Sequence, residues 1–355
     1  MTKRQIEIGG KKIHDDTHCF VVAEIGHNHQ GDLEICKKLF LRAKESGVDA
    51  VKLQKRSNRN LYTNDYYHTP YNSENAYGKT YGLHREALEF GEREYLELKR
   101  YAKKLGLIFF ATAFDFESVD FLEKIDISAY KVASGDITNI PLLEYIACKG
   151  KPMIVSTGGA FLKDIKRMQK TIASINSNLA ILQCTASYPA QFDELNLKVI
   201  KRYREEFPEH VIGISAHDNG IAMALAAAVL GARIIEKHFT LNRAMKGTDH
   251  SFSLEPSGMK KLVRDLQRLS LALGDGVKKV HESEKEAIKK MSKKIVAAKM
   301  LKKGRILQKK DLAFKSPGDG LPPYMSDYFI GKKLKKSLKE DETLKKSHVF
   351  PDKSN

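Results

Sequence analysis

The chain alternates between short apolar segments and longer amphipathic ones. The apolar segments are rich in β-branched and aliphatic residues, and most are hydrophobic at consecutive positions, as parallel strands covered on both faces are. The segments between them, such as residues 32–47, carry apolar residues at helical spacing, and this one ends in glycine. We therefore predict eight strands, at residues 19–26, 50–55, 108–114, 129–135, 152–158, 179–185, 211–217 and 233–239.

Eight strands that alternate with helices over roughly 250 residues predict a (β/α)8 TIM barrel. A long interruption, residues 56–92, follows the second strand and is rich in tyrosine, which is typical of a lid or binding loop. After the seventh strand, Asp218 and Asn219 are expected to cap a helix that begins near Ile221.

The pattern changes after residue 277, so we predict a barrel domain at residues 1–277 and a charged linker at 278–293. Residues 294–355 form short apolar pieces broken by glycine and proline, which predicts a small β-rich domain.

Composition and charge narrow the class of protein. With 42% hydrophobic and 30% charged residues, the 355-residue chain has the composition of a soluble globular protein. Its longest nearly apolar run, residues 221–232, is too short to span a bilayer, and its start lacks the apolar core of a signal peptide. We therefore expect a cytoplasmic protein with no membrane partner.

The net charge of +17 raises the question of a nucleic-acid partner. Most of the excess lies after Lys278, as scattered lysine pairs without interleaved aromatic residues. That distribution is typical of a solvated surface, or of a field that attracts anionic substrates. We therefore expect no nucleic-acid partner. The four cysteines stand far apart and form no CxxC pair, which argues against structural zinc and a disulfide framework.

Every predicted strand ends in polar groups. Because the carboxyl ends of barrel strands meet at one face, these groups predict an active site there. They are Glu24, Lys52, Gln54, Thr112, Lys131, Ser134, Asp136, Ser156, Thr185, Ser215, His217, Glu236 and His238.

The chemistry of these strand ends indicates an anionic substrate and a metal. Lys52 and Lys131, surrounded by hydroxyl groups, suit a phosphate and a carboxylate, although either lysine could instead neutralise a glutamate. His217 and His238 end adjacent strands near two glutamates, and paired imidazoles of this kind suit a divalent metal. The alternative is one acid–base histidine and one structural histidine.

The sequence resembles the sialic acid synthase (N-acetylneuraminate synthase) family across nearly its whole length. The matching motifs are VAEIGHNHQGDLEICKKLF, DAVKLQK, YKVASGDITNIPLLEYIACKGKPMIVSTGGA, QCTASYP and IIEKHFTLNRAMKGTDHSFSLEP, and the end of the chain, with AAKMLKKGRIL and KSPGDGLPP, is similar to that family's antifreeze-like (SAF) domain. The resemblance implies a nonulosonate synthase. Such an enzyme condenses phosphoenolpyruvate with a 2-acetamido mannose-type sugar and water, giving a nine-carbon 2-keto acid and phosphate.

The resemblance also implies roles for the matching residues. Phosphoenolpyruvate would be held by Lys52, Thr112, Lys131, Ser134, Ser156 and Ser215. Mn²⁺ or Mg²⁺ would be bound by His217 and His238, with Glu236 and Glu24 nearby through water, and Glu24 would guide the attacking water or a proton. The sugar would face Gln54, Asp136, Tyr188 and Asp249. A domain-swapped homodimer is the implied assembly.

Three departures from the family pattern bear on the sugar. Ala216 stands where an aspartate is common, and Asp136 is shorter than the usual glutamate. Ser316 replaces an arginine that, in the family, reaches the partner's sugar site; serine supplies no such fork of donors. The acceptor thus stays open between N-acetylmannosamine and a modified aldose of the legionaminate, pseudaminate or KDN type, and the motifs favour an unphosphorylated one.

Two rival functions make different predictions. A Schiff-base aldolase using Lys131 would be trapped by borohydride and would be indifferent to chelators. A polyanion-binding protein using the lysine-rich tail would bind nucleic acid with a steep salt dependence, and would leave the polar strand ends unexplained.

Overall fold

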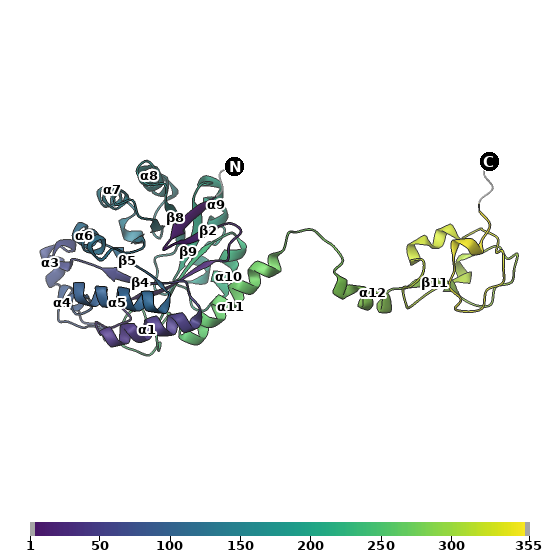
Figure 1. The fold of residues 1–355 in the computed structure, drawn as a ribbon, viewed down its shortest axis with the longest axis horizontal. Coiled ribbons are helices and arrows are strands. Elements are labelled where there is room, and N and C mark those ends of the chain that lie inside the picture. The colour runs from purple at the N-terminus through teal and green to yellow at the C-terminus, as the bar shows by residue number, and fades with distance from the viewer. Residues whose placement is uncertain (1–3, 352–355) are drawn as a thin grey trace. The chain divides into compact units, whose positions relative to one another are not determined.

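The computed structural model describes residues 4–351 and divides into two compact units, Met1–Gly274 and Asp275–Asn355 (Figure 1). Each unit has a hydrophobic core of its own. The finer domain limits at residues 277 and 293 stay predictions. Among the described residues, the helices are all too short or too polar to cross a membrane.

Within residues 4–351, eight parallel strands close into a barrel in the order β10-β3-β4-β5-β6-β7-β8-β9. This confirms the predicted fold class. Several strands are buried at every position, because helices cover one face and the barrel interior the other, which explains their consecutive apolar residues. The strands are β3 (Phe20–Gly26), β4 (Ala50–Lys55), β5 (Ile108–Ala113), β6 (Tyr130–Val132), β7 (Met153–Ser156), β8 (Leu179–Cys184), β9 (Val211–Ala216) and β10 (Ile234–His238).

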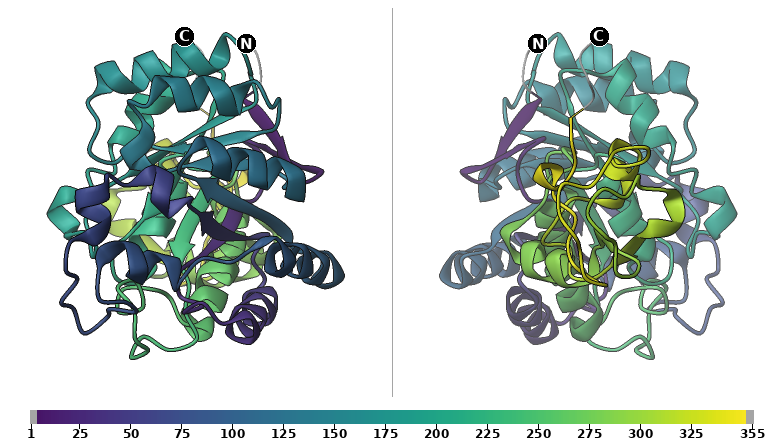
Figure 2. Two further views of the ribbon diagram at one scale, coloured as in Figure 1. Left: turned by 90° about the vertical axis from the view of Figure 1, so that its left-hand side faces the viewer. Right: turned by 90° about the vertical axis from the view of Figure 1, so that its right-hand side faces the viewer.

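Helices form the outer layer around these strands (Figure 1; Figure 2, left). The sequence sets the ends of these helices, as α1 (Leu33–Ser46) shows. Asp32 accepts hydrogen bonds from two backbone N–H groups at the start of α1, and Gly47 ends the helix in the left-handed conformation. The helices are α1 (Leu33–Ser46), α5 (Glu92–Leu105), α6 (Phe116–Ile125), α7 (Ile140–Ala147), α8 (Leu162–Ala173), α9 (Val199–Glu206), α10 (Ala222–Val229) and α11 (Pro256–Leu273).

A β-hairpin, β1 (Gln5–Ile8) and β2 (Lys11–His14), precedes the barrel. Its buried isoleucines share one core cluster with residues of the barrel strands: Ile6, Ile8, Ile13, Phe20, Val22, Ala50, Phe110, Ala129, Ile154, Ala180, Leu182, Val211 and Ile234. Most of these residues lie at the amino ends of their strands, so the hairpin packs against that end and leaves the carboxyl ends for the polar groups.

The interruption after β4 contains the short helices α2 (Asn58–Leu61), α3 (Asn64–His68) and α4 (Tyr81–Glu86). Its tyrosines pack against one another, with ring centroids 4.7 Å apart for Tyr66 and Tyr81. The segment is tied to the loop after β10, because Tyr77 donates to the Lys246 carbonyl at 2.6 Å and Asn75 accepts from the Gly247 N–H at 2.8 Å.

The predicted cap of helix α10 is wrong. The helix begins at Ala222, and Ile221 precedes it without a side-chain hydrogen bond. Asp218 instead accepts from Lys237, with Nζ 3.0 Å from Oδ1, and both side chains are buried. A buried ammonium group is costly without an anionic partner, and the Asp218 carboxylate is the partner of Lys237.

The second unit contains helix α12 (Lys285–Met291) and an antiparallel pair, β11 (Lys294–Ala297) and β12 (Leu312–Lys315). Its core is formed by Ile295, Ala297, Leu301, Leu307, Leu312, Phe329, Leu334, Leu338, Leu344 and Val349. Ser316 accepts a hydrogen bond from Lys293 Nζ at 2.6 Å, and Lys315 pairs with Asp341 at 2.5 Å.

Candidate functional site

The carboxyl ends of the barrel strands surround a cavity of about 600 Å³. Nearly all of the residues predicted from the strand ends and the resemblance line it: Glu24, Lys52, Gln54, Thr112, Lys131, Ser134, Ser156, Tyr188, Ser215, His217, Glu236, His238 and Asp249. Asp136 and Thr185 are not among the lining residues. Asp136 lies in a 3-10 helix after β6, where its Oδ1 accepts from Asn139 at 3.3 Å.

Lys52 is held by carboxylates from two neighbouring strands. Its Nζ lies 2.8 Å from Glu24 Oε2 and 3.5 Å from Glu236 Oε1, and it donates to Thr112 Oγ1 at 3.0 Å. Burial alone would lower the pKa of Lys52, but Glu236 and Glu24 raise it. Lys52 is therefore positively charged. It forms ion pairs with both glutamates.

Lys131 lies beside it with fewer charged partners. Its Nζ donates to Ser156 Oγ at 2.6 Å and to the Val132 carbonyl at 3.0 Å, and Glu236 Oε1 is 3.8 Å away. Burial lowers the pKa of Lys131 below its ordinary value. An anion entering the cavity would stabilise its charged form.

Glu236 connects the lysines to the hydroxyl groups. Ser215 donates to its Oε1 at 3.0 Å. Burial would raise the pKa of Glu236, but Lys131 and Lys52 together lower it to about 2. The floor of the cavity is thus a fixed array of charges and hydroxyl groups, held in place before any substrate arrives.

His217 and His238 stand next to this array, with ring centroids 5.4 Å apart. His217 Nδ1 lies 2.8 Å from the Thr185 carbonyl, which places its proton on Nδ1 and leaves Nε2 as a free acceptor. Burial and the neighbouring His238 lower the pKa of His217 to about 3, so the ring is neutral. The Tyr188 ring packs on His217 at 4.1 Å.

These imidazoles fit a divalent cation with two protein ligands. His238 Nδ1 is buried without a hydrogen-bond partner, as expected of a nitrogen reserved for a ligand. Among residues 4–351, no three His, Cys, Asp or Glu side chains come close enough together to hold a metal by themselves. A cation here would take its remaining ligands from water or substrate.

Gly26 lies close to three of the residues that line the cavity. Its φ of 52° is left-handed, and a Cβ there would lie 3.1 Å from Glu24 Oε1, 3.2 Å from Gln54 Nε2 and 3.7 Å from Asp249 Oδ2. Any side chain at this position would occupy space between these groups.

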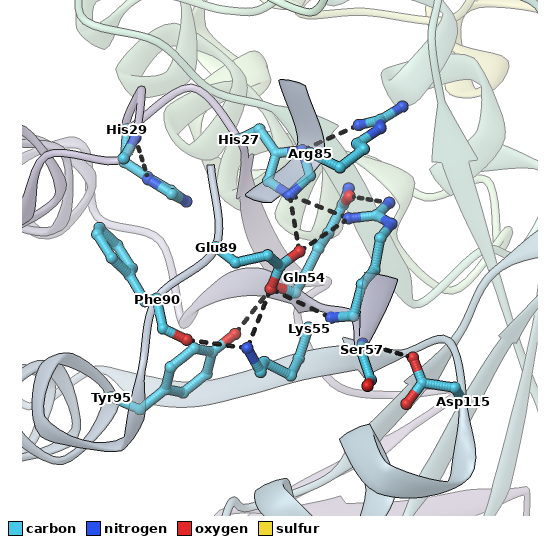
Figure 3. Close-up of polar contacts among 12 residues, drawn as sticks. His27, His29, Gln54, Lys55, Ser57, Arg85, Glu89, Phe90, Tyr95 and Asp115 are labelled. Carbon is cyan, nitrogen blue, oxygen red and sulfur yellow. Dashed lines mark hydrogen bonds and ion pairs between the residues drawn. The ribbon is translucent and has the colours of Figure 1, made fainter. Parts of the chain in front are cut away.

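The sequence prediction missed two arginines that line the cavity, Arg56 and Arg85. Both contact the His27 ring: Arg56 Nη1 lies 3.0 Å from Nε2, and Arg85 Nη1 lies 3.1 Å from Nδ1. Figure 3 shows His27 with Arg85, Gln54 and Glu89 around it. The alternation of Lys52 and Gln54 along β4 was a signal for Arg56, since every second residue faces the barrel interior.

The chain matches two known protein families. A model described as the NeuB family matches residues 39–278, which is more than half of the chain. The chain belongs to the NeuB family. A SAF domain model matches residues 294–349. Both matches confirm the resemblance and the antifreeze-like fold expected of the second unit.

Relatives of the chain cover nearly its whole length. It is 40% identical to the N-acetylneuraminate-9-phosphate synthase of Homo sapiens, over 92% of this chain and 91% of that protein. It is 39% identical to the N,N'-diacetyllegionaminic acid synthase of Campylobacter jejuni, over 92% of this chain and 98% of that protein. The solved structure of an N-acetylneuraminic acid synthetase from Leptospira borgpetersenii is similar, with a TM-score of 0.71, 33% identity, and coverage of 81% of this chain and 95% of that one.

Proposed function

We propose that this NeuB family member is a nonulosonate synthase. It condenses phosphoenolpyruvate with a 2-acetamido mannose-type sugar, or a modified aldose of that kind, and water; the products are a nine-carbon 2-keto acid and phosphate. The observation that carries the proposal is the pair of buried lysines, Lys52 and Lys131, at the floor of a cavity whose wall holds His217 and His238. The names of the relatives, which include sialic and legionaminic acid synthases, support the same class.

The floor residues hold phosphoenolpyruvate. Lys52 and Lys131 neutralise its phosphate and carboxylate, and the hydroxyl groups of Thr112, Ser134 and Ser156 donate to the same oxygens. Ser215 contributes to the same site through its hydrogen bond to Glu236. As the C–O bond to phosphate breaks, negative charge develops on the leaving oxygens, and the lysines stabilise it without reorganisation.

A divalent cation, Mn²⁺ or Mg²⁺, would be held by His217 and His238 with Glu236 and Glu24 nearby, and when bound it would polarise the aldehyde of the open-chain sugar. Phosphoenolpyruvate C3 then forms the new bond to the aldehyde carbon, whose oxygen takes up a proton. Water adds to C2 and gives up one proton, leaving a hydroxyl group there. This hydroxyl group loses the second proton as the 2-keto group forms, while phosphate departs with the bridging oxygen and takes up a proton. Glu24 is the base that orients this water, because its Oε2 is fixed by Lys52 and its Oε1 by Gln54 at 2.7 Å.

The upper wall orients the sugar. Gln54, Tyr188 and Asp249 line the cavity beyond the lysines and present an amide, a phenol and a carboxylate to sugar hydroxyls. Asp136 stays a predicted sugar contact. Ser316 is hydrogen-bonded within its own unit, so recognition of the acceptor falls to the barrel and its tyrosine-rich interruption.

The proposed assembly is a domain-swapped homodimer, as the resemblance implies, and its proposed location is the cytoplasm. Sedimentation equilibrium of the full chain tests the dimer, with an expected mass about twice the 40.1 kDa of one chain. A mass of one chain at all concentrations would contradict it.

Phosphate release from phosphoenolpyruvate tests the proposed reaction. The protein is stripped with a chelator, restored with Mn²⁺, and given N-acetylmannosamine, its 6-phosphate, mannose or a 2,4-diacetamido-trideoxy sugar. Release that requires both a sugar and the metal is expected for at least one of them. Release with none, or covalent trapping by borohydride together with indifference to the chelator, would contradict the proposal and favour a Schiff-base aldolase.

A further inference from the structure

The amide of Gln54 connects two charged side chains in the wall of the cavity. Its Nε2 donates to Glu24 Oε1 at 2.7 Å, and its Oε1 accepts from Arg56 Nη2 at 2.7 Å. A guanidinium group has no acceptor atom, and the Glu24 carboxylate, which pairs with Lys52, accepts rather than donates. Both neighbours therefore require the same orientation of the amide, with its oxygen toward Arg56 and its nitrogen toward Glu24.

The backbone places these groups in a row. Lys52, Gln54 and Arg56 are alternate residues along β4 and its end, so they face the same side, and all three line the cavity. Glu24 lies opposite Lys52 on β3. The space for the amide comes from Gly26, because a Cβ there would lie 3.2 Å from Gln54 Nε2 and 3.1 Å from Glu24 Oε1. A continuous series of polar contacts thus leads from Arg56 to Glu24.

The Arg56 guanidinium is itself fixed from several sides. Its Cζ lies 3.8 Å from the centroid of the Phe114 ring. Its Nη1 lies 3.0 Å from His27 Nε2 and 3.9 Å from Glu89 Oε1, and the backbone N–H of Arg56 donates to Glu89 Oε2 at 3.2 Å. Figure 3 shows Gln54, His27 and Glu89 converging on one place. The side chain is only 8% exposed, so this donor is oriented before any substrate binds.

We propose that Arg56 is a positioning residue for the synthase reaction, acting through the Gln54 amide to hold Glu24 in the orientation that directs the attacking water. The inference rests on the proposed function, in which Glu24 is the base. Without Arg56, Gln54 Oε1 loses its charged donor, and the amide is free to turn away from Glu24 toward water in the cavity. Glu24 then keeps its ion pair with Lys52 but loses the partner that fixes Oε1.

The test measures phosphate release by the full-length, Mn²⁺-restored Arg56→Met variant with the sugar that the unsubstituted enzyme uses. We expect kcat at saturating sugar to fall about 10- to 100-fold, the effect of losing one hydrogen bond from a charged donor. KM for phosphoenolpyruvate should stay unchanged, because Lys52 and Lys131 remain in place.

Three other results of this assay are informative. An unchanged kcat in folded Arg56→Met overturns the inference. A higher KM for the sugar with unchanged kcat also overturns it, because the guanidinium would then contact the substrate directly. In both cases the proposed function stands. An unsubstituted enzyme that releases no phosphate with any sugar overturns the proposed function and the inference together.

A double-variant cycle separates this role from a general loss of structure. Introducing Arg56→Met into the Gln54→Met variant is expected to change kcat by less than about twofold, because the connection to Glu24 is already broken. If Arg56→Met lowers kcat by the same factor in both backgrounds, Arg56 does not act through Gln54 and the inference is overturned.

Two further variants complete the test. Arg56→Lys keeps the positive charge and one donor, so its kcat should lie between those of Arg56→Met and the unsubstituted enzyme. If Arg56→Met does not fold, the cycle is run with Arg56→Lys and interpreted in the same way. Arg59→Met is the matched control and should keep full kcat, because Arg59 lies in the same interruption, is exposed, and packs on the Tyr67 ring 3.7 Å away.

Discussion

The two lysines at the floor of the cavity differ in their surroundings. Lys52 lies between two carboxylates that raise its pKa, whereas burial lowers the pKa of Lys131, whose near neighbours are a hydroxyl and a carbonyl. Lys52 thus fixes the glutamates, and Lys131 has more to gain from an incoming anion.

Replacement of Lys52 tests this arrangement. Lys52→Met leaves the Glu24 and Glu236 carboxylates without the cation between them, so they repel each other and the anionic substrate. We expect kcat/KM for phosphoenolpyruvate to fall about 10²- to 10³-fold, measured as phosphate release at saturating sugar. Lys99→Met, which removes an exposed ion pair with Asp126, serves as control. An unchanged KM for phosphoenolpyruvate in folded Lys52→Met would refute the assignment.

Gly26 tests the space between the floor and the sugar. Gly26→Ala places a methyl group among Glu24, Gln54 and Asp249, so kcat/KM for the sugar should fall at least about tenfold. The left-handed φ also costs about 1 kcal/mol of stability. Gly150→Ala is the control, because its φ of 72° carries the same strain and its Cβ would meet no atom within 4 Å. Equal sugar kinetics in both variants would show that Gly26 does not shape the sugar site.

Sequence reasoning found the strand-end residues because barrel geometry collects them at one face. It missed Arg56, which continues the alternation of Lys52 and Gln54, because the predicted strand ended at residue 55. It missed Arg85 because its position depends on the interruption after β4, whose short helices follow no periodic pattern. Arg85 reaches the cavity only because α4 folds back over His27. Asp218 was misassigned because its partner, Lys237, lies on β10, and no local sequence pattern predicts an ion pair between residues that far apart in the chain.

At the scale of elements, the amino-terminal hairpin was the main omission. Its sequence, QIEIGGKKIH, does carry the signal of a hairpin: apolar residues alternate with polar ones on both sides of a Gly-Gly turn. The barrel strands were predicted because they are apolar on consecutive residues, while a hairpin with one buried face is only half as hydrophobic.

Truncation in the hairpin tests its role in the barrel core. Ile13 is 1% exposed and packs in the cluster that fills the amino end of the barrel. Ile13→Ala is expected to lower the free energy of unfolding of the barrel by about 2–5 kcal/mol, measured by urea denaturation. Leu271→Ala, at a side chain that is 80% exposed, should have little effect. Equal stability of the two variants would show that the hairpin is not part of the core.

The second unit holds an ion pair between a buried Asp311 and a partly exposed Arg305, and this pair has a defined pH dependence. Arg305 Nε and Nη2 donate to Asp311 at 2.9 and 2.7 Å, and these hydrogen bonds lower the pKa of Asp311 below 3.8 despite burial. The folded unit therefore favours the ionised form. Its contribution is present above about pH 4 and is lost as the pH falls through the folded-state pKa.

Asp311→Asn removes that contribution at neutral pH. We expect the Tm of the second unit to fall by about 5 °C at pH 7, and the difference from the unsubstituted protein to shrink below pH 4. Asp327→Asn, at an exposed position, is the control. A difference in Tm that persists unchanged at pH 3 would show that ionisation of Asp311 is not its source.

At the scale of the whole molecule, the fold and the place of its site were predictable from the same feature, whereas the reaction class came from the resemblance to a known family. Apolar strands with polar ends specify a barrel and place its chemistry at one face. The acceptor was not predictable, because it depends on a few side chains from an irregular segment and on Ser316, which departs from the family pattern. The structure places Arg56 and Arg85 of that segment in the lining of the cavity.

The central claim is that this cavity joins phosphoenolpyruvate to a sugar with cleavage of the C–O bond. The most direct measurement uses phosphoenolpyruvate labelled with ¹⁸O at the bridging oxygen, with mass analysis of both products. The account predicts that the label leaves with phosphate and that the 2-keto acid takes its C2 oxygen from water. Label retained in the keto acid, or phosphate released without a new carbon–carbon bond, would contradict it.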